Sequence, residues 1–204
     1  MKEFKYILLV LMMLPLTLAV SSCSEENENE DEFADWQVRN DEMQTVWAND
    51  PSLKKIKAYT MDQNTAGAVY DYVYVKSLEG VEISIEDELY VPMFTDTCRV
   101  AYRGYLIPSK SYPDGYVFDQ SYVGEFQWTT AAPYTGVCSG FVVGFTTALM
   151  KMHVGDRWRV YIPYQLAYDS NSSTGYPAYS NMIFDIALFE KWKPKDIVPP
   201  FKTR

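Results

Sequence analysis

Histidine and cysteine are scarce in this chain of 204 residues, which has one His and three Cys. So few ligands leave little for a zinc site of ordinary composition or for a scaffold held by several disulfides. The only histidine, His153, lies in Met152-His153-Val154-Gly155-Asp156, which reads as a helix end followed by a turn. A structural histidine fits this context better than the base of a serine or cysteine hydrolase, which would need a nucleophile beside it.

Basic residues are also fewer than acidic ones. The chain has 18 basic and 27 acidic residues, a formal net charge of −9. A nucleic-acid-binding protein needs a basic face to meet phosphates, so the balance argues against nucleic acid as a partner. Apolar residues make up 48% and aromatic residues 16% of the chain, with 17 Tyr and 10 Phe. This composition excludes a disordered protein and predicts a globular one with an aromatic core.

The first 22 residues resemble an export signal. Lys2 and Lys5 precede an apolar run over residues 6–20, which is short for a membrane span. Small residues before Cys23 resemble the box that precedes the lipidated cysteine of bacterial lipoproteins. Residues 1–22 are therefore predicted to be a lipoprotein signal peptide, with Cys23 acylated and anchoring the chain to a membrane. An ordinary secretory signal, with Cys23 free or removed, is the alternative.

Residues 23–35 are predicted to be an acidic tether. Residues 24–35 carry seven acidic side chains and no basic one, and such a run repels itself and stays extended. An acidic run after the lipidated cysteine resembles the surface-export signal of Bacteroidetes-type lipoproteins, whereas a plain charged spacer facing the periplasm is the alternative. We therefore expect a lipid-anchored protein of the bacterial cell envelope, at the outer membrane and on its periplasmic or surface-exposed face.

Residues 36–68 are expected to form a helical appendage. One helical face is expected to carry Phe33, Trp36, Met43, Val46 and Trp47, and Pro51 ends that helix and begins a second, short one. From Val69 onward the pattern changes to short strands with one helix at about residues 144–152, which predicts an α+β domain with the helix on one face of an antiparallel sheet. The expected strands cover residues 70–76, 88–91, 98–103, 116–118, 126–128, 157–162 and 182–188.

The remaining residues offer no obvious reactive centre. Cys98 alternates with apolar residues and is expected to point inward. Cys138 lies in a glycine-containing loop, and a Cys98–Cys138 disulfide is permitted by the export route but is not the favoured reading. The glycines near Cys138 have the spacing of neither a phosphate loop nor a dinucleotide fingerprint. Aromatic residues and ordered loops suit a pocket for an apolar ligand better than one that activates a nucleophile.

Five blocks of sequence, in order, resemble the FKBP-type peptidyl-prolyl cis–trans isomerases. They end or centre on Tyr102-Arg103-Gly104, on Phe118-Asp119, on the stretch 141–156, on the stretch 161–168, and on Tyr176-Pro177-Ala178 with residues 183–186. The resemblance implies an FKBP-like fold over residues 69–193, an antiparallel twisted sheet wrapped around one short α-helix, followed by a C-terminal tail at 194–204. No cofactor or metal is implied.

The resemblance also carries over site residues. Tyr102, Asp119 and Tyr168 fall on the positions implied to act in catalysis, with Asp119 held by Tyr102 and the Tyr168 hydroxyl anchoring a substrate carbonyl. The implied substrate-binding residues are Phe118, Phe126, Phe141, Val142 (through its backbone N–H), Phe145, Tyr176 and Phe184, and Trp128 falls on an aromatic core position.

Three departures from the family pattern concern the pocket. Phe145 replaces the tryptophan of the pocket floor, Asp169 replaces a glycine, and the segment 129–140 is longer than in the family core. They bear on the rate of catalysis more than on the fold.

The implied function is a membrane-anchored isomerase that assists folding of exported proteins. Its expected partners are X-Pro segments of exported polypeptides and a possible tacrolimus-type macrolide ligand. A non-catalytic peptide-binding or chaperone module on the same fold is the main alternative. A surface glycan-binding lipoprotein is a further one, which the absence of carboxylate clusters disfavours.

Overall fold

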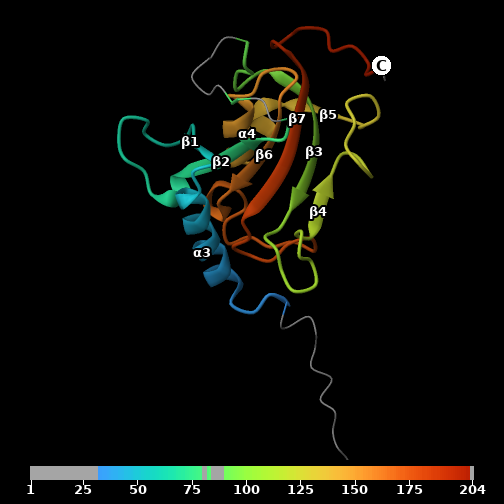
Figure 1. Cartoon of the computed structure of the whole chain (residues 1–204). Coiled ribbons are helices and arrows are strands. Elements are labelled where there is room, and N and C mark those ends of the chain that lie inside the picture. Colours follow the sequence, from blue (N-terminus) through green and yellow to red (C-terminus); the bar gives the residue numbers. More distant parts are fainter. Residues whose placement is uncertain (1–31, 80–81, 84–89, 203–204) are drawn as a thin grey trace, which may run out of the picture. The chain divides into compact units, whose positions relative to one another are not determined.

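The computed structural model describes residues 32–79, 82–83 and 90–202, and they belong to one compact unit that begins at Glu32 (Figure 1). The expected signal peptide, Cys23 and the tether up to residue 31 lie outside the described residues. Residues 32–35 are already folded onto the unit, because Glu32 is buried and accepts a hydrogen bond from the Ser111 backbone N–H at 3.2 Å. Among the described residues, none of the helices combines the length and apolar character that a membrane crossing requires.

The unit is built on one seven-stranded antiparallel sheet with the order β1-β2-β6-β7-β3-β4, and β5 pairs with β3 beside β4. The strands are β1 (Lys54–Lys57), β2 (Tyr72–Ser77), β3 (Thr97–Tyr105), β4 (Val117–Gln120), β5 (Tyr134–Val137), β6 (Arg157–Ile162) and β7 (Met182–Trp192). The helices are α3 (Trp36–Asn49) and α4 (Val143–Leu149), with short 3₁₀ turns η1 (Val69–Asp71), η2 (Cys138–Gly140) and η3 (Tyr164–Leu166).

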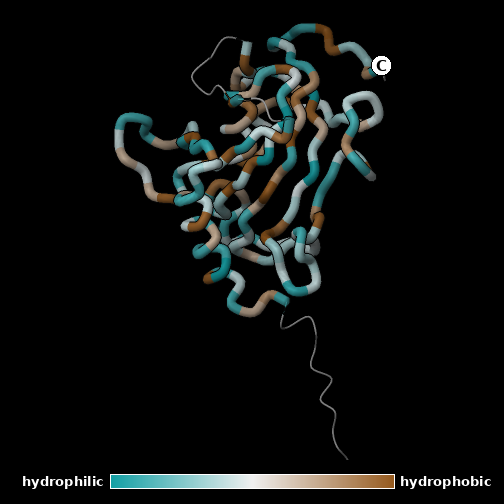
Figure 2. Tube along the Cα trace, in the orientation of Figure 1, coloured by the Kyte–Doolittle hydropathy of each residue, from teal (hydrophilic) through white to brown (hydrophobic). Residues whose placement is uncertain are grey.

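One face of the sheet, here called the inner face, packs on α4. Along β6 the residues Trp158, Val160 and Ile162 alternate with outward ones and are buried in the same core as α4. Gly144 lets the helix approach, since a Cβ there would lie 2.2 Å from Cγ2 of Ile162. Hydrophobic residues follow the central strands and hydrophilic ones dominate most peripheral loops (Figure 2). The expected fold, an antiparallel sheet with a short helix on one face, is confirmed.

The opposite, outer face carries polar and aromatic residues. Arg159 makes a bidentate ion pair with Asp185 on the neighbouring strand, with N···O distances of 2.6 and 2.8 Å. Beside it a chain of ring contacts forms a second, smaller apolar cluster. The rings in contact are Tyr122, Phe126, Trp128 and Phe189, with centroid distances of 5.5, 5.2 and 4.8 Å along the chain.

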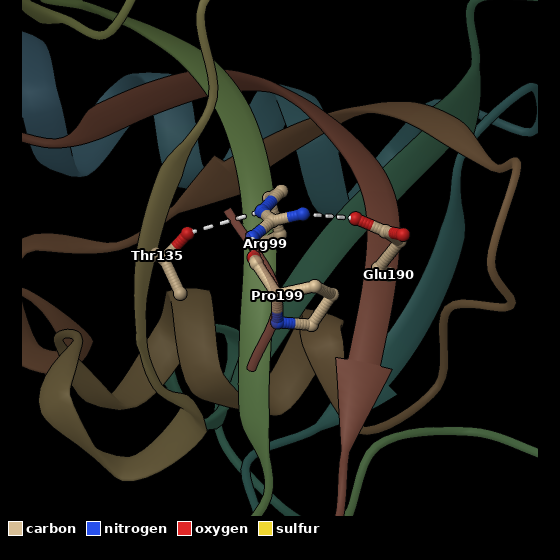
Figure 3. A network of polar contacts seen from close by, with 4 residues as sticks. All are labelled: Arg99, Thr135, Glu190 and Pro199. Carbon is tan, nitrogen blue, oxygen red and sulfur yellow. Dashed lines mark hydrogen bonds and ion pairs between the residues drawn. The ribbon is translucent and has the colours of Figure 1, made fainter. Parts of the chain in front are cut away.

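The C-terminal tail is attached to the outer face by Arg99 of β3 (Figure 3). This side chain is 4% exposed, pairs with Glu190 of β7 and donates to Thr135 Oγ1 of β5 at 3.2 Å. Its remaining nitrogen donates to the backbone oxygen of Pro199 at 2.5 Å, and its guanidinium lies 5.4 Å from the centre of the Phe201 ring. One buried arginine thus joins β5, β7 and the tail.

The expected appendage at 36–68 is in part wrong. The first helix is confirmed as α3, which ends before Pro51, but the second helix is the edge strand β1. Leu53, Ile56 and Tyr59 have helical spacing, yet Ile56 is buried between two outward lysines and pairs with Val73 of β2. Strand pairing therefore overrides a weak helical period, and residues 36–68 are part of the main unit rather than an addition to it.

The other strand predictions are partly confirmed and partly wrong. Residues 157–162 match β6, and 182–188 match most of β7. Residues 126–128 are wrong as a strand, because they form irregular chain and the start of a turn on the outer face. Strand β5 is not among the expected strands. Of the expected strand 88–91, residues 88–89 lie outside the described residues, and 90–91 are not strand.

Candidate functional site

A cavity of about 310 Å³ opens on the inner face beside the N-terminal end of α4. Seven of its eight lining residues were expected in the site, and Gly140 is the addition. The lining residues are Tyr102, Asp119, Gly140, Phe141, Val142, Phe145, Tyr168 and Phe184. A larger cavity of about 670 Å³ lies against the tail on the outer face, lined by Arg99 and Phe201 among others, and contains none of the expected site residues.

The bottom of the cavity is a cluster of rings around Phe145, which is 2% exposed. Phe141 stacks on it with centroids 4.4 Å apart and planes 12° apart. Phe184 and Tyr102 meet it edge to face at 5.1 and 5.9 Å. Such offset and edge contacts fix each ring against its neighbours, so the apolar wall is preformed.

The packing around Gly104 explains why a glycine follows Tyr102-Arg103 in this motif. It lies on β3 opposite Phe184, and a Cβ there would lie 2.7 Å from Phe184 Cε1 and 2.8 Å from Phe118 Cζ. The two rings can therefore pack directly over the strand, 5.5 Å apart, only because the side chain is missing. The glycine of this motif is therefore needed for the aromatic wall to pack.

One polar pair lies at the edge of the cavity. Tyr102 of β3 donates its hydroxyl to Oδ2 of Asp119 on β4 at 3.1 Å, as the resemblance implied. Burial, and then the negative charge of Asp119, raises the pKa of Tyr102 well above its ordinary value. The hydroxyl therefore stays protonated and remains a donor. Asp119 itself is exposed, so its charge lies at the boundary between solvent and the apolar wall.

Tyr168 lines the cavity, and Tyr176 supports it from outside the lining. Their rings stack at 4.8 Å with planes 18° apart, and Tyr176 meets Phe118 edge to face at 5.7 Å. Burial raises the pKa of Tyr168, with smaller contributions from Tyr176 and Asp119, which keeps its hydroxyl neutral. Asp169 adopts φ 52°, the left-handed conformation that a glycine takes easily and that Asp tolerates better than most residues. The substitution of glycine by Asp169 thus leaves this backbone turn possible.

Three of the expected substrate-binding residues do not line the cavity. Phe118 and Tyr176 contact the lining rings of Phe184 and Tyr168, whereas Phe126 lies on the outer face. It packs between Tyr122 and Trp128 in the outer-face cluster, with Arg157 over its ring at 4.2 Å. Trp128 likewise contacts Phe189 there. The resemblance implied a pocket position for Phe126 and a core position for Trp128 on a strand, but the chain at 126–128 is irregular and belongs to the other side of the sheet. Neither residue lines the 310 Å³ cavity.

The chain just before α4 supplies two further lining residues, Gly140 and Val142. Val142 is the N-terminal cap residue of α4, which brings its backbone to the cavity. The missed residue, Gly140, belongs to η2, and the glycine-rich stretch around it was the available signal. The segment 129–140, which is longer than in the family core, supplies both η2 and β5.

Metal-ligating and nucleophilic groups do not gather at this cavity. Within the described ranges, no three His, Cys, Asp or Glu side chains are placed to hold a metal ion. His153 lies in the turn after α4, where its backbone N–H donates to Asp156 Oδ2 at 2.7 Å. Cys98 and Cys138 are buried free thiols in the core. The arrangement can bind an apolar ring and direct a few polar groups at it.

Comparisons with known proteins agree with this geometry. Residues 91–189 match the family described as FKBP-type peptidyl-prolyl cis-trans isomerase. The chain is 39% identical over 98 residues to the macrophage infectivity potentiator of Trypanosoma cruzi, covering 48% of this chain and 44% of that protein. It is 35% identical over 102 residues to the FKBP-type 22 kDa peptidyl-prolyl cis-trans isomerase of Escherichia coli, covering 49% and 43%.

The longest of these matches extends beyond the domain. The E. coli FKBP-type isomerase FkpA is 29% identical over 187 residues, which cover 83% of this chain and 64% of that protein. The crystal structure of E. coli FkpA has the same fold, with a TM-score of 0.54 over 78% of this chain and 60% of that one, at 24% identity. The chain spans less than two thirds of the length of these three curated relatives. With this fold, this aromatic cavity and the match over residues 91–189, the chain carries a domain of the FKBP-type peptidyl-prolyl cis–trans isomerase family.

Proposed function

We propose that this chain is a peptidyl-prolyl cis–trans isomerase that acts on X-Pro bonds of exported polypeptides from a lipid-anchored position in the cell envelope. The observation that carries the proposal is the preformed cavity in which Phe145 and Phe184 face the Tyr102–Asp119 pair. Support for the reaction also comes from the names of the relatives, two of which are called peptidyl-prolyl isomerases.

The chemistry suits such a cavity. Rotation about an X-Pro bond breaks no covalent bond but must cross a barrier of about 18–20 kcal/mol that amide resonance creates. Resonance places negative charge on the carbonyl oxygen, and water favours that separation of charge. A twisted amide has lost much of it, so an apolar cavity favours the twisted state over the planar one.

Each part of the cavity then has a task in this proposal. Phe145 and Phe184 hold the proline ring, Phe118 supports Phe184 from outside the lining, and the Tyr168 hydroxyl anchors a substrate carbonyl. The Val142 backbone N–H fixes the peptide. Asp119 acts electrostatically beside the twisting carbonyl and is oriented by the hydroxyl of Tyr102.

The test is a protease-coupled isomerisation assay on a proline tetrapeptide, with and without a tacrolimus-type macrolide. We expect acceleration that the macrolide removes, because both ligands need the same apolar cavity. Peptide binding without acceleration would point instead to a non-catalytic module on the same fold. That outcome is a real alternative because Phe145 gives the cavity a smaller floor than tryptophan would.

The anchoring part of the proposal has its own test. Cys23 is the residue proposed to carry the acyl chains, so Cys23→Ala should move the protein from the membrane fraction to the soluble fraction. Metabolic labelling with a fatty acid should mark the wild type and leave the variant unmarked. A variant that stays with membranes after signal cleavage would contradict the lipid anchor without touching the isomerase proposal.

A further inference from the structure

Helix α3 buries a polar face. Asn40 and Gln44 are 0% and 2% exposed, at positions between the buried rings of Trp36 and Trp47. A helix held only by packing would bury apolar residues there, because a polar side chain gains nothing from burial unless it finds hydrogen-bond partners. The partners of this face therefore indicate what the helix does.

Asn40 binds Asn181, the residue directly before β7. The backbone N–H of Asn181 donates to Oδ1 of Asn40 at 2.8 Å, and Nδ2 of Asn181 donates to the backbone oxygen of Asn40 at 2.7 Å. The remaining oxygen, Oδ1 of Asn181, accepts from Gln44 Nε2 and from the Tyr164 backbone N–H, both at 2.9 Å. Asn181 is 0% exposed, so these bonds fix its position without competition from water.

A second pair continues the connection toward the cavity. Trp36 Nε1 donates to Ser180 Oγ at 2.8 Å, and Ser180 Oγ donates to the backbone oxygen of Pro177 at 2.7 Å. Pro177 directly follows Tyr176, whose ring stacks on Tyr168 in the wall of the cavity. Two consecutive residues of the segment 176–181, Ser180 and Asn181, are thus bonded to α3.

We propose that α3 positions Tyr176, which supports the lining residue Tyr168, and that Trp36 and Asn40 are positioning residues for the isomerase. Neither residue touches the cavity itself. They act through Ser180 and Asn181, which hold the end of the segment that presents Tyr176. The inference rests on the proposed isomerase function for its kinetic effect and on the hydrogen bonds alone for its structural effect.

The test compares variants on α3 that keep the helix. Trp36→Phe keeps a ring against Phe33, which it meets at 5.1 Å, but loses the N–H that binds Ser180. Asn40→Ala removes the acceptor for the Asn181 N–H. Trp47→Phe is the matched control, because Trp47 is buried on the same helix and meets Tyr161 at 5.2 Å, whereas the hydrogen bonds from α3 to Ser180 and Asn181 come from other residues.

The readouts are Tm, separate KM and kcat values from NMR exchange on a proline peptide, and hydrogen exchange across residues 176–181. We expect Trp36→Phe and Asn40→Ala to raise KM by about threefold to tenfold with a smaller change in kcat, because a displaced wall weakens substrate binding. Exchange at residues 176–181 should accelerate in both. Trp47→Phe should lower Tm with KM and exchange at 176–181 unchanged.

Several results decide against the proposal. It is overturned if Trp36→Phe and Asn40→Ala lower Tm but leave KM and exchange at residues 176–181 unchanged. It is also overturned if Trp47→Phe raises KM and exchange at 176–181 as much as those two variants do. If Asn40→Ala fails to fold, Trp36→Phe decides. A wild type without isomerase activity defeats the proposed function, and the positioning role is then decided by hydrogen exchange and by the Kd for the same peptide.

Discussion

The hydroxyl of Tyr102 on β3 donates to the carboxylate of Asp119 on β4 at 3.1 Å, across the two strands that pair Gly104 with Asp119. Gly104 leaves room for Phe118 of β4 and for Phe184 of β7, the two strands that flank it. The close pairing that builds the apolar wall therefore also sets the one charged group at its edge. Strand β3 thus joins the charged group on β4 to the ring of Phe184 on β7.

The raised pKa of Tyr102 predicts that kcat/KM does not change with pH up to moderately alkaline values. Burial and Asp119 raise its pKa above the ordinary value of about 10, so the folded protein keeps the proton where the unfolded chain loses it. The resulting contribution to stability is complete below about pH 10 and is lost as the pH rises above that value. We expect constant kcat/KM from about pH 6 to 9. A step in kcat/KM within that range that Tyr102→Phe abolishes would contradict the raised pKa.

Replacing the pocket floor should preserve or raise activity. Phe145 is buried but borders the 310 Å³ cavity, so an indole can extend into that space at some cost to the stacked Phe141. We expect Phe145→Trp to keep or increase kcat/KM, with a stability change of at most about 1–3 kcal/mol. Phe145→Leu is the control and should lower both kcat/KM and the stability of the protein. Loss of activity in a well-folded Phe145→Trp protein would show that the smaller floor is required.

Starting the chain at Val69 should prevent stable folding. Residues 36–68 were expected to be an appendage, but this truncation deletes β1 and the buried residues Trp36, Trp47 and Ile56. Deleting several buried side chains costs more than about 5 kcal/mol, which is comparable to the whole stability of a domain. Circular dichroism and denaturant unfolding measure the effect. A truncated monomer with the wild-type unfolding midpoint would contradict it.

The two core thiols should be protected until the chain unfolds. Cys98 and Cys138 are both 0% exposed, and their mutual hydrogen bond, with burial second, raises the pKa of Cys98. Thiolate is the reactive form, so a thiol reagent should not modify the native protein. In a Cys23→Ser background purified without reductant, we expect two thiols per chain to react once denaturant is added. No reactive thiol under those conditions would instead indicate a Cys98–Cys138 disulfide.

The sequence predicted what depends on alternation and on ordered motifs. Alternating Trp158, Val160 and Ile162 gave β6 its bounds, and the motif residues Tyr102 and Asp119 proved to be bonded partners. It failed where a local pattern has two readings. Phe126 and Trp128 alternate like a strand but pack from irregular chain on the outer face.

The links that rest on contacts between distant residues could not be predicted from local patterns. Ile56 fits a helix by spacing and becomes a strand only through its partner Val73. Asn40 and Asn181 are 141 positions apart, and nothing in either neighbourhood announces their two hydrogen bonds. Such pairs become visible only in the folded chain, because they depend on how the elements meet.

The most direct measurement compares isomerisation of a proline tetrapeptide by the wild type, Asp119→Ala and Phe184→Ala, with Tm measured in parallel. The account predicts acceleration by the wild type and a loss in both variants by different routes. Asp119 is exposed, so Asp119→Ala should lose activity with little change in Tm, whereas Phe184 is 4% exposed, so Phe184→Ala should also lose about 3–5 kcal/mol of stability. A wild type without acceleration, or an Asp119→Ala protein with full activity, would contradict the proposed mechanism.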